Sequence, residues 1–147
     1  MRGRGGKVAL DFGIPLTTVH PTARRFAAAL DAEDYDAVRA ALAPNCVYHA
    51  PEGTLVGPDR ILSSYRAQGA AARHRFEKIE YASALEAIGP GDAIVTFIDR
   101  LMLAGAWHEF QCRQRIRIGS ADLVDEIWHE EIPGERERLQ EFEAGSE

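Results

Sequence analysis

A carboxylate at position 99 interrupts an otherwise apolar strand face. Residues two apart in a β-strand share a face, so Asp99 lies on the side of Val95 and Phe97. Buried carboxylates rarely lack a partner. Asp99 therefore either meets Arg100, Arg113 or a backbone amide, or it faces a pocket. In a pocket, burial raises the pKa of its carboxyl group and suits Asp99 to catalysis as an acid or a base.

Tyr48 and His49 lie side by side in a short β-prone run that stops at Pro51. Neighbouring side chains of a strand point to opposite faces, so only one of the two faces the interior. An aromatic ring with a polar tip fits a pocket wall. We therefore expect Tyr48 to lie inside, as the neighbour of Asp99, and His49 to lie at the surface or an interface.

Near the end of the chain, Trp128 and His129 also take opposite faces of one strand, and each face mixes polar with apolar residues. Trp128 is either a core residue or a platform for a ligand. His129 is either a catalytic base or a residue of the outer sheet face.

Metal and cofactor motifs are missing from the sequence. The histidines have no HxH or HxxxH spacing, and Cys46 and Cys112 form no CxxC pair. There is no glycine-rich phosphate loop and no serine nucleophile elbow. We therefore predict no metal site and no cofactor.

A row of arginines, Arg113, Arg115 and Arg117, alternates with apolar residues and so lies on one strand face. It could bind anions, cross a dimer interface, or pair with Glu77, Glu80 or acidic residues of the next strand. We favour cross-strand pairing.

Three helices are expected before the strands. The first begins at Pro21 and buries Phe26 among small residues, and the second is capped by Asp34 and ends at Pro44. The third starts at Gly57-Pro58 and carries Tyr65 on its apolar side, and Gly69 should loosen its end.

The rest of the chain reads as strands near 76–88, 93–104, 107–118 and 122–132, separated by turn signals, with a short charged helix over 133–142. Such connections make an antiparallel meander. Strands of this length twist and curl, which gives the sheet a concave side that helices fill only in part.

Composition narrows the class of protein. The chain has 147 residues, 46% of them hydrophobic, and a net charge of −6, which suits one globular domain and argues against binding nucleic acid. No apolar run is long enough to span a membrane. Two thiols without a disulfide pattern indicate the cytoplasm. Residues 1–18 are expected to be a flexible N-terminal arm and 19–143 the domain.

The order of these elements resembles the nuclear transport factor 2-like superfamily, particularly its SnoaL-like polyketide-cyclase branch, over residues 20–142. The motifs that carry the resemblance are Tyr48-His49-Ala50-Pro51 with Gly57-Pro58-Asp59-Arg60-Ile61, and Ile127-Trp128-His129-Glu130. The resemblance implies an α+β fold. A strongly curved mixed or antiparallel sheet packs on three N-terminal helices to form a cone with one pocket, followed by a short C-terminal helix.

Known chemistries of this superfamily fit the chain poorly. At the positions that resemble those of ketosteroid isomerases, Ala50 replaces the base and Gln114 replaces the second acid. At those that resemble epoxide hydrolases, Asp99 is retained, whereas Phe97 and Trp128 replace the arginine and the second carboxylate. The usual partners for acid and base catalysis are therefore absent.

Two functions remain open. The first is a cofactor-independent isomerase, cyclase or hydrolase of a small apolar or cyclic molecule, with Asp99 as acid or base and Tyr48 or Gln114 polarising a substrate oxygen. The second is a non-catalytic ligand-binding or dimerisation module whose pocket is lined by Tyr65, Phe97 and Trp128. The resemblance also implies a homodimer formed through the outer sheet face.

Overall fold

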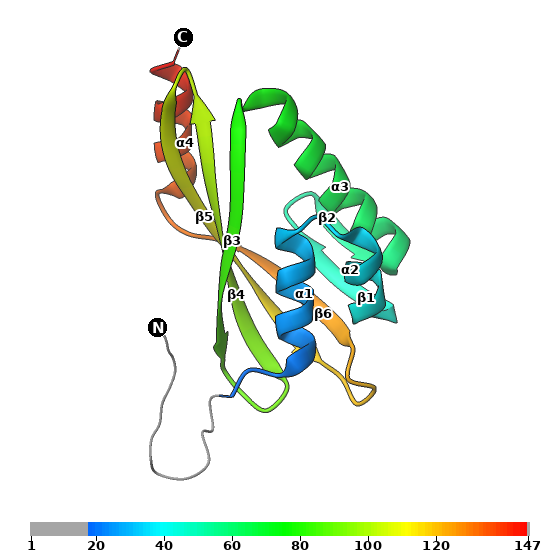
Figure 1. The fold of residues 1–147 in the computed structure, drawn as a ribbon. Coiled ribbons are helices and arrows are strands. Elements are labelled where there is room, and N and C mark those ends of the chain that lie inside the picture. The colour runs from blue at the N-terminus through cyan, green and yellow to red at the C-terminus, as the bar shows by residue number, and fades with distance from the viewer. Residues whose placement is uncertain (1–17, 147) are drawn as a thin grey trace, which may run out of the picture.

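The computed structural model describes residues 18–146, so the arm predicted for residues 1–18 falls outside the described residues except for its last position. This part of the chain folds into four helices and six strands (Figure 1). In chain order they are α1 (Pro21–Asp31), α2 (Tyr35–Ala41), β1 (Leu42–Ala50), β2 (Gly53–Val56), α3 (Pro58–Arg75), β3 (Lys78–Ala87), β4 (Asp92–Leu103), β5 (Ala106–Ile118), β6 (Val124–Glu131) and α4 (Glu135–Ala144).

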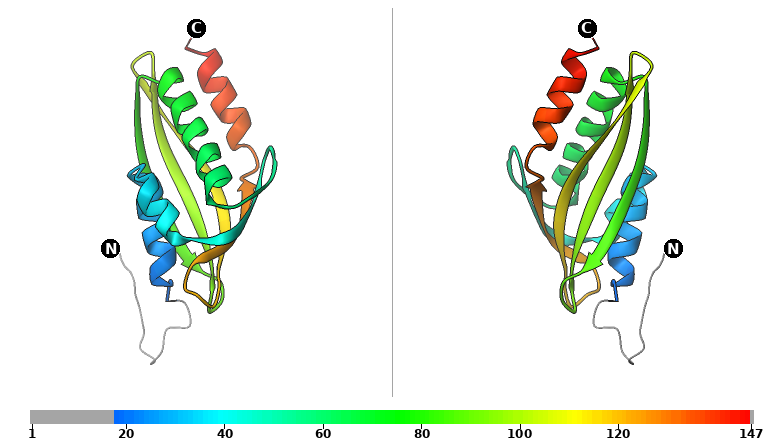
Figure 2. Two further views of the ribbon diagram at one scale, coloured as in Figure 1. Left: turned by 90° about the vertical axis from the view of Figure 1, so that its right-hand side faces the viewer. Right: turned by 90° about the vertical axis from the view of Figure 1, so that its left-hand side faces the viewer.

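The strands form one sheet in the order β2-β1-β6-β5-β4-β3. All neighbours are antiparallel except β1 and β6, which run parallel, so the sheet is mixed. Figure 2 shows β3, β4 and β5 bending along their length beside α3. The inner face of the sheet is the face against which α1 and α3 pack, and the outer face is the opposite one. The predicted α+β cone with its four-strand meander is confirmed.

Two details of the prediction are wrong. Pro44 does not end the second helix, because α2 stops at Ala41 and Pro44 lies within β1, where the pairing with β6 changes register. Proline has no backbone N–H to donate to the neighbouring strand, and it is tolerated there because the regular pairing is interrupted at that point. Gly69 does not loosen α3, which continues to Arg75, since one glycine costs a helix only about 1 kcal/mol.

Local sequence explains where α2 begins and how β4 turns into β5. The carboxylate of Asp34 caps α2 by accepting a hydrogen bond of 3.2 Å from the backbone N–H of Ala37. Ala104 and Gly105 join β4 to β5 with positive φ values of 51° and 78°. Two successive residues with positive φ form the hairpin turn whose twist matches that of the flanking strands, which keeps β4 and β5 paired along their whole length.

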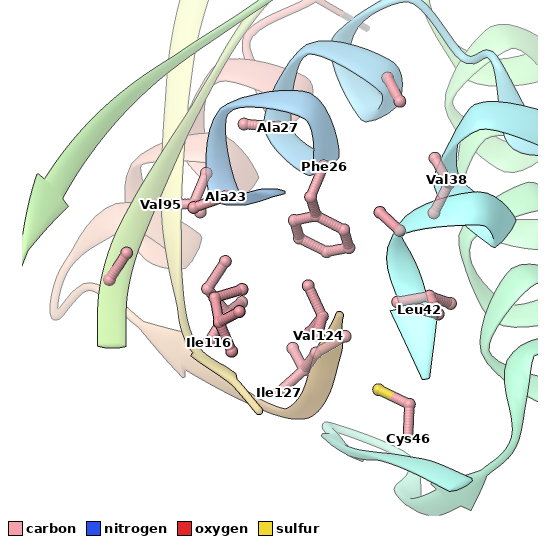
Figure 3. Packing of buried hydrophobic residues seen from close by; sticks show 14 of the residues in the cluster. Ala23, Phe26, Ala27, Val38, Leu42, Cys46, Val95, Ile116, Val124 and Ile127 are labelled. Atoms are coloured by element: carbon pink, nitrogen blue, oxygen red, sulfur yellow. The ribbon is translucent and has the colours of Figure 1, made fainter. Parts of the chain in front are cut away.

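A compact core lies between α1, α2 and the parallel pair β1 and β6. Figure 3 shows the ring of Phe26 directed at Ile116, Val124 and Ile127, and all four side chains are fully buried. This core fills the end of the cone near the start of α1. The opposite half of the inner face, beyond Val95, is less tightly covered and holds the candidate site.

Candidate functional site

A cavity of about 220 Å³ opens between the inner face of the sheet, the end of α1 and the second half of α3. Aromatic, acidic and small side chains form its walls. The lining residues are Leu30, Asp31, Glu33, Tyr35, Tyr65, Gln68, Gly69, Ala72, Tyr81, Phe97, Asp99, Cys112, Gln114 and His129.

Asp99 lies in the wall of the cavity, directly across the β3–β4 ladder from Tyr81. Neither expected arginine pairs with it: Arg100 instead donates to Glu80 at 2.6 Å. Within residues 18–146, no ion pair or side-chain hydrogen bond reaches the Asp99 carboxyl group. Burial, with the nearby negative charge of Asp31, raises the pKa of Asp99 to about 6.

Asp31 is the last residue of α1 and faces the same cavity. Its carboxylate accepts a hydrogen bond of 2.6 Å from the hydroxyl group of Ser83 on β3. Burial raises the pKa of Asp31, and the Ser83 bond opposes this rise. Asp31 and Asp99 therefore place two acidic groups in one small space.

Gln114 is the centre of a hydrogen-bonded network at the inner end of the cavity. Tyr65 donates to its carbonyl oxygen at 2.7 Å, and its Nε2 donates to the hydroxyl oxygen of Tyr48 at 3.0 Å and lies 3.5 Å from Nδ1 of His129. The amide group thus has partners for its oxygen and for both of its hydrogens. Gln114 therefore fixes its neighbours and has no N–H left to polarise a substrate.

Tyr48 is fully buried and is not part of the cavity wall, but it contacts two residues that are, Gln114 and Tyr65. Its ring stacks on Tyr65 with centroids 5.4 Å apart. Burial raises the pKa of Tyr48 above its ordinary value, which keeps the phenol protonated. The predicted contact between Tyr48 and Asp99 is absent among the described residues, because two other strands, β5 and β6, separate β1 from β4.

His129 lies on the inner face, paired in register with Gln114. Its Nε2 is 3.1 Å from Glu131, whose carboxylate also binds Arg136 at 3.0 Å. A proton on Nε2 of His129 satisfies Glu131 and leaves Nδ1 free to accept from Gln114, so the hydrogen-bond pattern assigns this tautomer. Of the two positions left open for His129, the structure shows the inner one.

A polar cluster at the rim of the cavity is built around Glu33. Its carboxylate accepts from the hydroxyl group of Tyr35 at 3.2 Å and from Arg73 at 2.5 Å. A Cβ atom at position 69 would lie 2.6 Å from the Glu33 carboxylate. Glycine at position 69 therefore lets this cluster lie against α3.

Trp128 does not line the cavity, which corrects the predicted pocket role. It pairs in register with Arg115, whereas the adjacent His129 pairs with Gln114, so Trp128 lies on the outer face. There its indole ring stacks with His49 at 5.7 Å and lies 4.8 Å below the guanidinium group of Arg115. These contacts hold the ring outside, because arginine and histidine can remain near water while covering it.

The arginine row lies mainly in cross-strand ion pairs. Arg115 binds Asp92 at 3.0 Å, and Arg117 binds Asp125 at 3.1 Å and Glu126 at 2.6 Å. The pairing partners are acidic residues of adjacent strands, as expected, but not Glu77 or Glu80.

The sequence analysis did not single out three polar residues of the cavity wall, Asp31, Glu33 and Tyr81, and it left the position of His129 open. The signal for Tyr81 was present, because Ile79, Tyr81, Ser83 and Leu85 alternate with exposed residues along β3. Asp31 and Glu33 gave no such signal, since acidic residues at the end of a helix usually face water.

Residues 18–146 form a curved α+β cone with a cavity on the inner face of its sheet. Residues 23–118 match the family model of the SnoaL-like domain, so the chain belongs to the SnoaL-like family. No curated protein matches the chain.

Solved structures of similar fold are distant in sequence. TerC, co-crystallised with polyporic acid, is 11% identical with a TM-score of 0.63, and the match covers 84% of this chain and 95% of TerC. A nuclear transport factor 2-like protein of unknown function from Burkholderia pseudomallei is 19% identical with a TM-score of 0.61, covering 80% and 93% of the two chains. At this identity the similarity establishes the fold alone.

Two further observations describe what residues 18–146 contain. No group of three or more histidine, cysteine, aspartate or glutamate side chains is placed to hold a metal ion in this part of the chain. Among the described helices, none combines the length and apolar character needed to cross a membrane.

Proposed function

We propose that this protein binds a small apolar or cyclic molecule in its cavity and that Asp99 acts on the ligand as a general acid or base, in a cofactor-independent isomerase, cyclase or hydrolase. The observation that carries the proposal is the Asp99 carboxyl group, which faces the cavity with no ion-pair or side-chain hydrogen-bond partner in the described part of the chain. A group held in this way has its acid and base capacity available to a ligand.

The proton chemistry follows from the environment of this carboxyl group. With a pKa of about 6, Asp99 is mostly ionised at neutral pH yet accepts a proton more readily than an exposed aspartate does. It could therefore take a proton from a carbon next to a carbonyl group and return it elsewhere on the same molecule.

Tyr81 is the best placed donor to a ligand oxygen. Its hydroxyl group has no hydrogen-bond partner within residues 18–146, and burial raises its pKa to about 12, so it remains protonated. Tyr48 and Gln114 hold Tyr65 and His129 in position, and in this proposal they support the site rather than contact the reacting atoms.

A non-catalytic ligand-binding module is the second candidate. It is favoured by the saturated amide group of Gln114, which leaves the inner end of the cavity without a free N–H to stabilise a developing oxyanion. In this case Asp99 contributes to binding only.

Hydrogen–deuterium exchange separates the two candidates without knowledge of the substrate. The protein is incubated in D₂O with a small cyclic ketone, 2-tetralone, and deuterium uptake next to the carbonyl group is followed by NMR. Catalysis by Asp99 predicts faster exchange with the wild type than with Asp99→Asn. Equal exchange rates for the two proteins would favour the binding module.

We also propose a homodimer formed through the outer face, and a cytoplasmic location. The dimer is supported by Trp128, a large ring on that face that remains partly exposed beside His49 and Arg115, and the location by two cysteines that form no disulfide. Sedimentation velocity tests the dimer. An Arg113→Glu substitution on the same face should weaken it, whereas a wild-type monomer at all concentrations would exclude it.

A further inference from the structure

The charge of the cavity wall is one-sided. Asp31, Glu33 and Asp99 line it, and no lysine or arginine of residues 18–146 does. His129 is the one histidine in the wall of this cavity, and it is already hydrogen-bonded between Gln114 and Glu131. A negatively charged ligand would therefore meet repulsion from the wall and no cationic partner.

The three carboxylates differ in how far the protein neutralises them. Glu33 is paired with Arg73 at the rim. Asp31 has only the neutral hydroxyl group of Ser83, and Asp99 has no side-chain partner among residues 18–146. Two acidic groups thus lie in the cavity without a counter-charge, which is costly because a buried carboxylate needs a partner.

The end of α1 adds to this negative potential. The helix stops at Asp31, has no basic residue in its last turn, and contributes Leu30 and Asp31 to the cavity wall. The C-terminal end of a helix carries partial negative charge and favours cations. This contribution comes from the backbone and is independent of the acidic side chains.

Aromatic rings flank the unpaired carboxyl group. Tyr81 lies directly across from Asp99, and Phe97 lies two residues before it on the same face of β4. In the described residues, neither ring is stacked on another ring or covered by a guanidinium group. Tyr35, by contrast, already has Arg66 over its ring at 4.9 Å. The free faces of aromatic rings attract cations, especially where water is excluded.

We propose that the ligand of this cavity carries a protonated basic nitrogen, held by Asp31 and Asp99 against the rings of Tyr81 and Phe97. This inference rests on the proposed small-molecule site and specifies the charge class of its ligand: a cyclic or aromatic amine rather than a carboxylate or phosphate. A bound ammonium group supplies the counter-charge that both carboxylates lack.

Three probes with one carbon skeleton test the charge class. Binding of 2-phenylethylamine, 2-phenylethanol and phenylacetate is measured by calorimetry at pH 7.5. The amine should bind at least about tenfold more tightly than the alcohol, a ratio equivalent to about 1.4 kcal/mol, and phenylacetate should bind most weakly. Tighter binding of phenylacetate than of the amine would overturn the inference.

Variants then test which side chains cause the preference for the amine over the alcohol. Asp31→Asn and Asp99→Asn should each lower the ratio of amine to alcohol affinity by about fivefold, and the exposed Glu86→Gln on β3 serves as the control that retains it. A ratio unchanged in both aspartate variants would contradict the proposed position of the nitrogen. If amine and alcohol bind wild type equally, the cavity still binds small molecules but the charge class is wrong. If neither binds, both proposals fail.

The pH dependence provides a separate readout. Lowering the pH from 7.5 to 5 should reduce the amine preference, because Asp99 takes up a proton over this range. The pH dependence of the amine preference is also measured for Asp31→Asn and His129→Gln, because the wall contains other titratable groups. They are Asp31 on α1, Glu33 and Tyr35, Tyr65 on α3, Tyr81 on β3, Cys112 on β5 and His129 on β6. An amine preference that rises towards pH 5 would contradict the inference.

Discussion

Tyr81 on β3 and Asp99 on β4 are direct cross-strand partners, and both side chains face the cavity. The phenol of Tyr81 keeps its proton at neutral pH, since its pKa is raised to about 12, and so can donate a hydrogen bond, whereas the ionised carboxylate of Asp99 can only accept. The pair therefore offers a ligand one donor and one base on the same wall.

Asp99→Asn should make the protein more stable near neutral pH. The pKa of this carboxyl group rises from 3.8 to about 6 on folding, so the folded state holds the proton more tightly than the unfolded state does. Below pH 3.8 both states are protonated and there is no penalty. As the pH rises through about 6, the wild type loses stability relative to the variant, by about 3 kcal/mol in total.

Urea unfolding at several pH values between 4 and 7.5 measures this difference. The free energy of unfolding of Asp99→Asn minus that of the wild type should increase with pH over this range. The exposed Glu86→Gln should show no comparable increase. A difference that stays constant with pH would mean that burial does not perturb Asp99.

Tyr65→Phe should destabilise the fold, whereas Tyr81→Phe should not. Tyr65 donates to the buried carbonyl oxygen of Gln114 at 2.7 Å, and loss of that donor leaves the oxygen unsatisfied at a cost of about 1–2 kcal/mol. The hydroxyl group of Tyr81 has no such partner in the part of the chain the structure describes, so its removal should change stability by less than about 0.5 kcal/mol. Thermal unfolding of the two matched variants gives the comparison. Equal losses would argue against the Gln114 network.

The sequence predicted the architecture well because the evidence for it is local. Alternation along β3 to β6 and the turn at Gly105 are properties of neighbouring residues, and they recur in the sheet. The same reasoning placed Asp99 on an inward face, since Val95 and Phe97 share it.

The composition of the cavity wall was harder to predict, because it depends on contacts between distant segments. Asp31 enters the site only because α1 ends above Ser83, which lies 52 residues further along the chain. The orientation of Trp128 depends on Arg115 and His49, which cover the ring on the outer face. The sequence did not show which side chains of β6 face inward, because both faces of this strand mix polar and apolar residues.

Both cysteines should react slowly with iodoacetamide in the folded protein. Burial raises the pKa of the Cys46 and Cys112 thiols to about 12, so little thiolate is present at pH 8. Alkylation should be at least about 100-fold slower than that of free cysteine, because the thiolate is the reactive form. Mass spectrometry follows each site separately.

The two thiols also form an internal control for ligand binding. Cys112 lines the cavity and Cys46 does not, so a bound molecule should slow alkylation of Cys112 further and leave Cys46 unchanged. Both should react rapidly in urea. Rapid alkylation of Cys112 in the native protein would contradict its burial.

Arg136→Gln should raise the pKa of Glu131. Hydrogen bonding to Arg136 is the largest cause of the lowered pKa of this carboxyl group, and His129 contributes as well. Removing the guanidinium group takes away two contacts of 3.1 and 3.0 Å. The carboxylate should then protonate at a higher pH, as measured by ¹³C NMR of the side chain. Arg138→Gln, which removes a pair with Glu135 instead, is the matched control and should leave Glu131 unchanged. The ring of His129 gives a second readout at pH 7.5, because its Nε2–H group is hydrogen-bonded to Glu131. The ¹⁵N shifts of the ring should therefore show the Nε2–H tautomer in the wild type. A shift pattern of the opposite tautomer in the wild type would contradict the hydrogen-bond chain from Arg136 to Gln114.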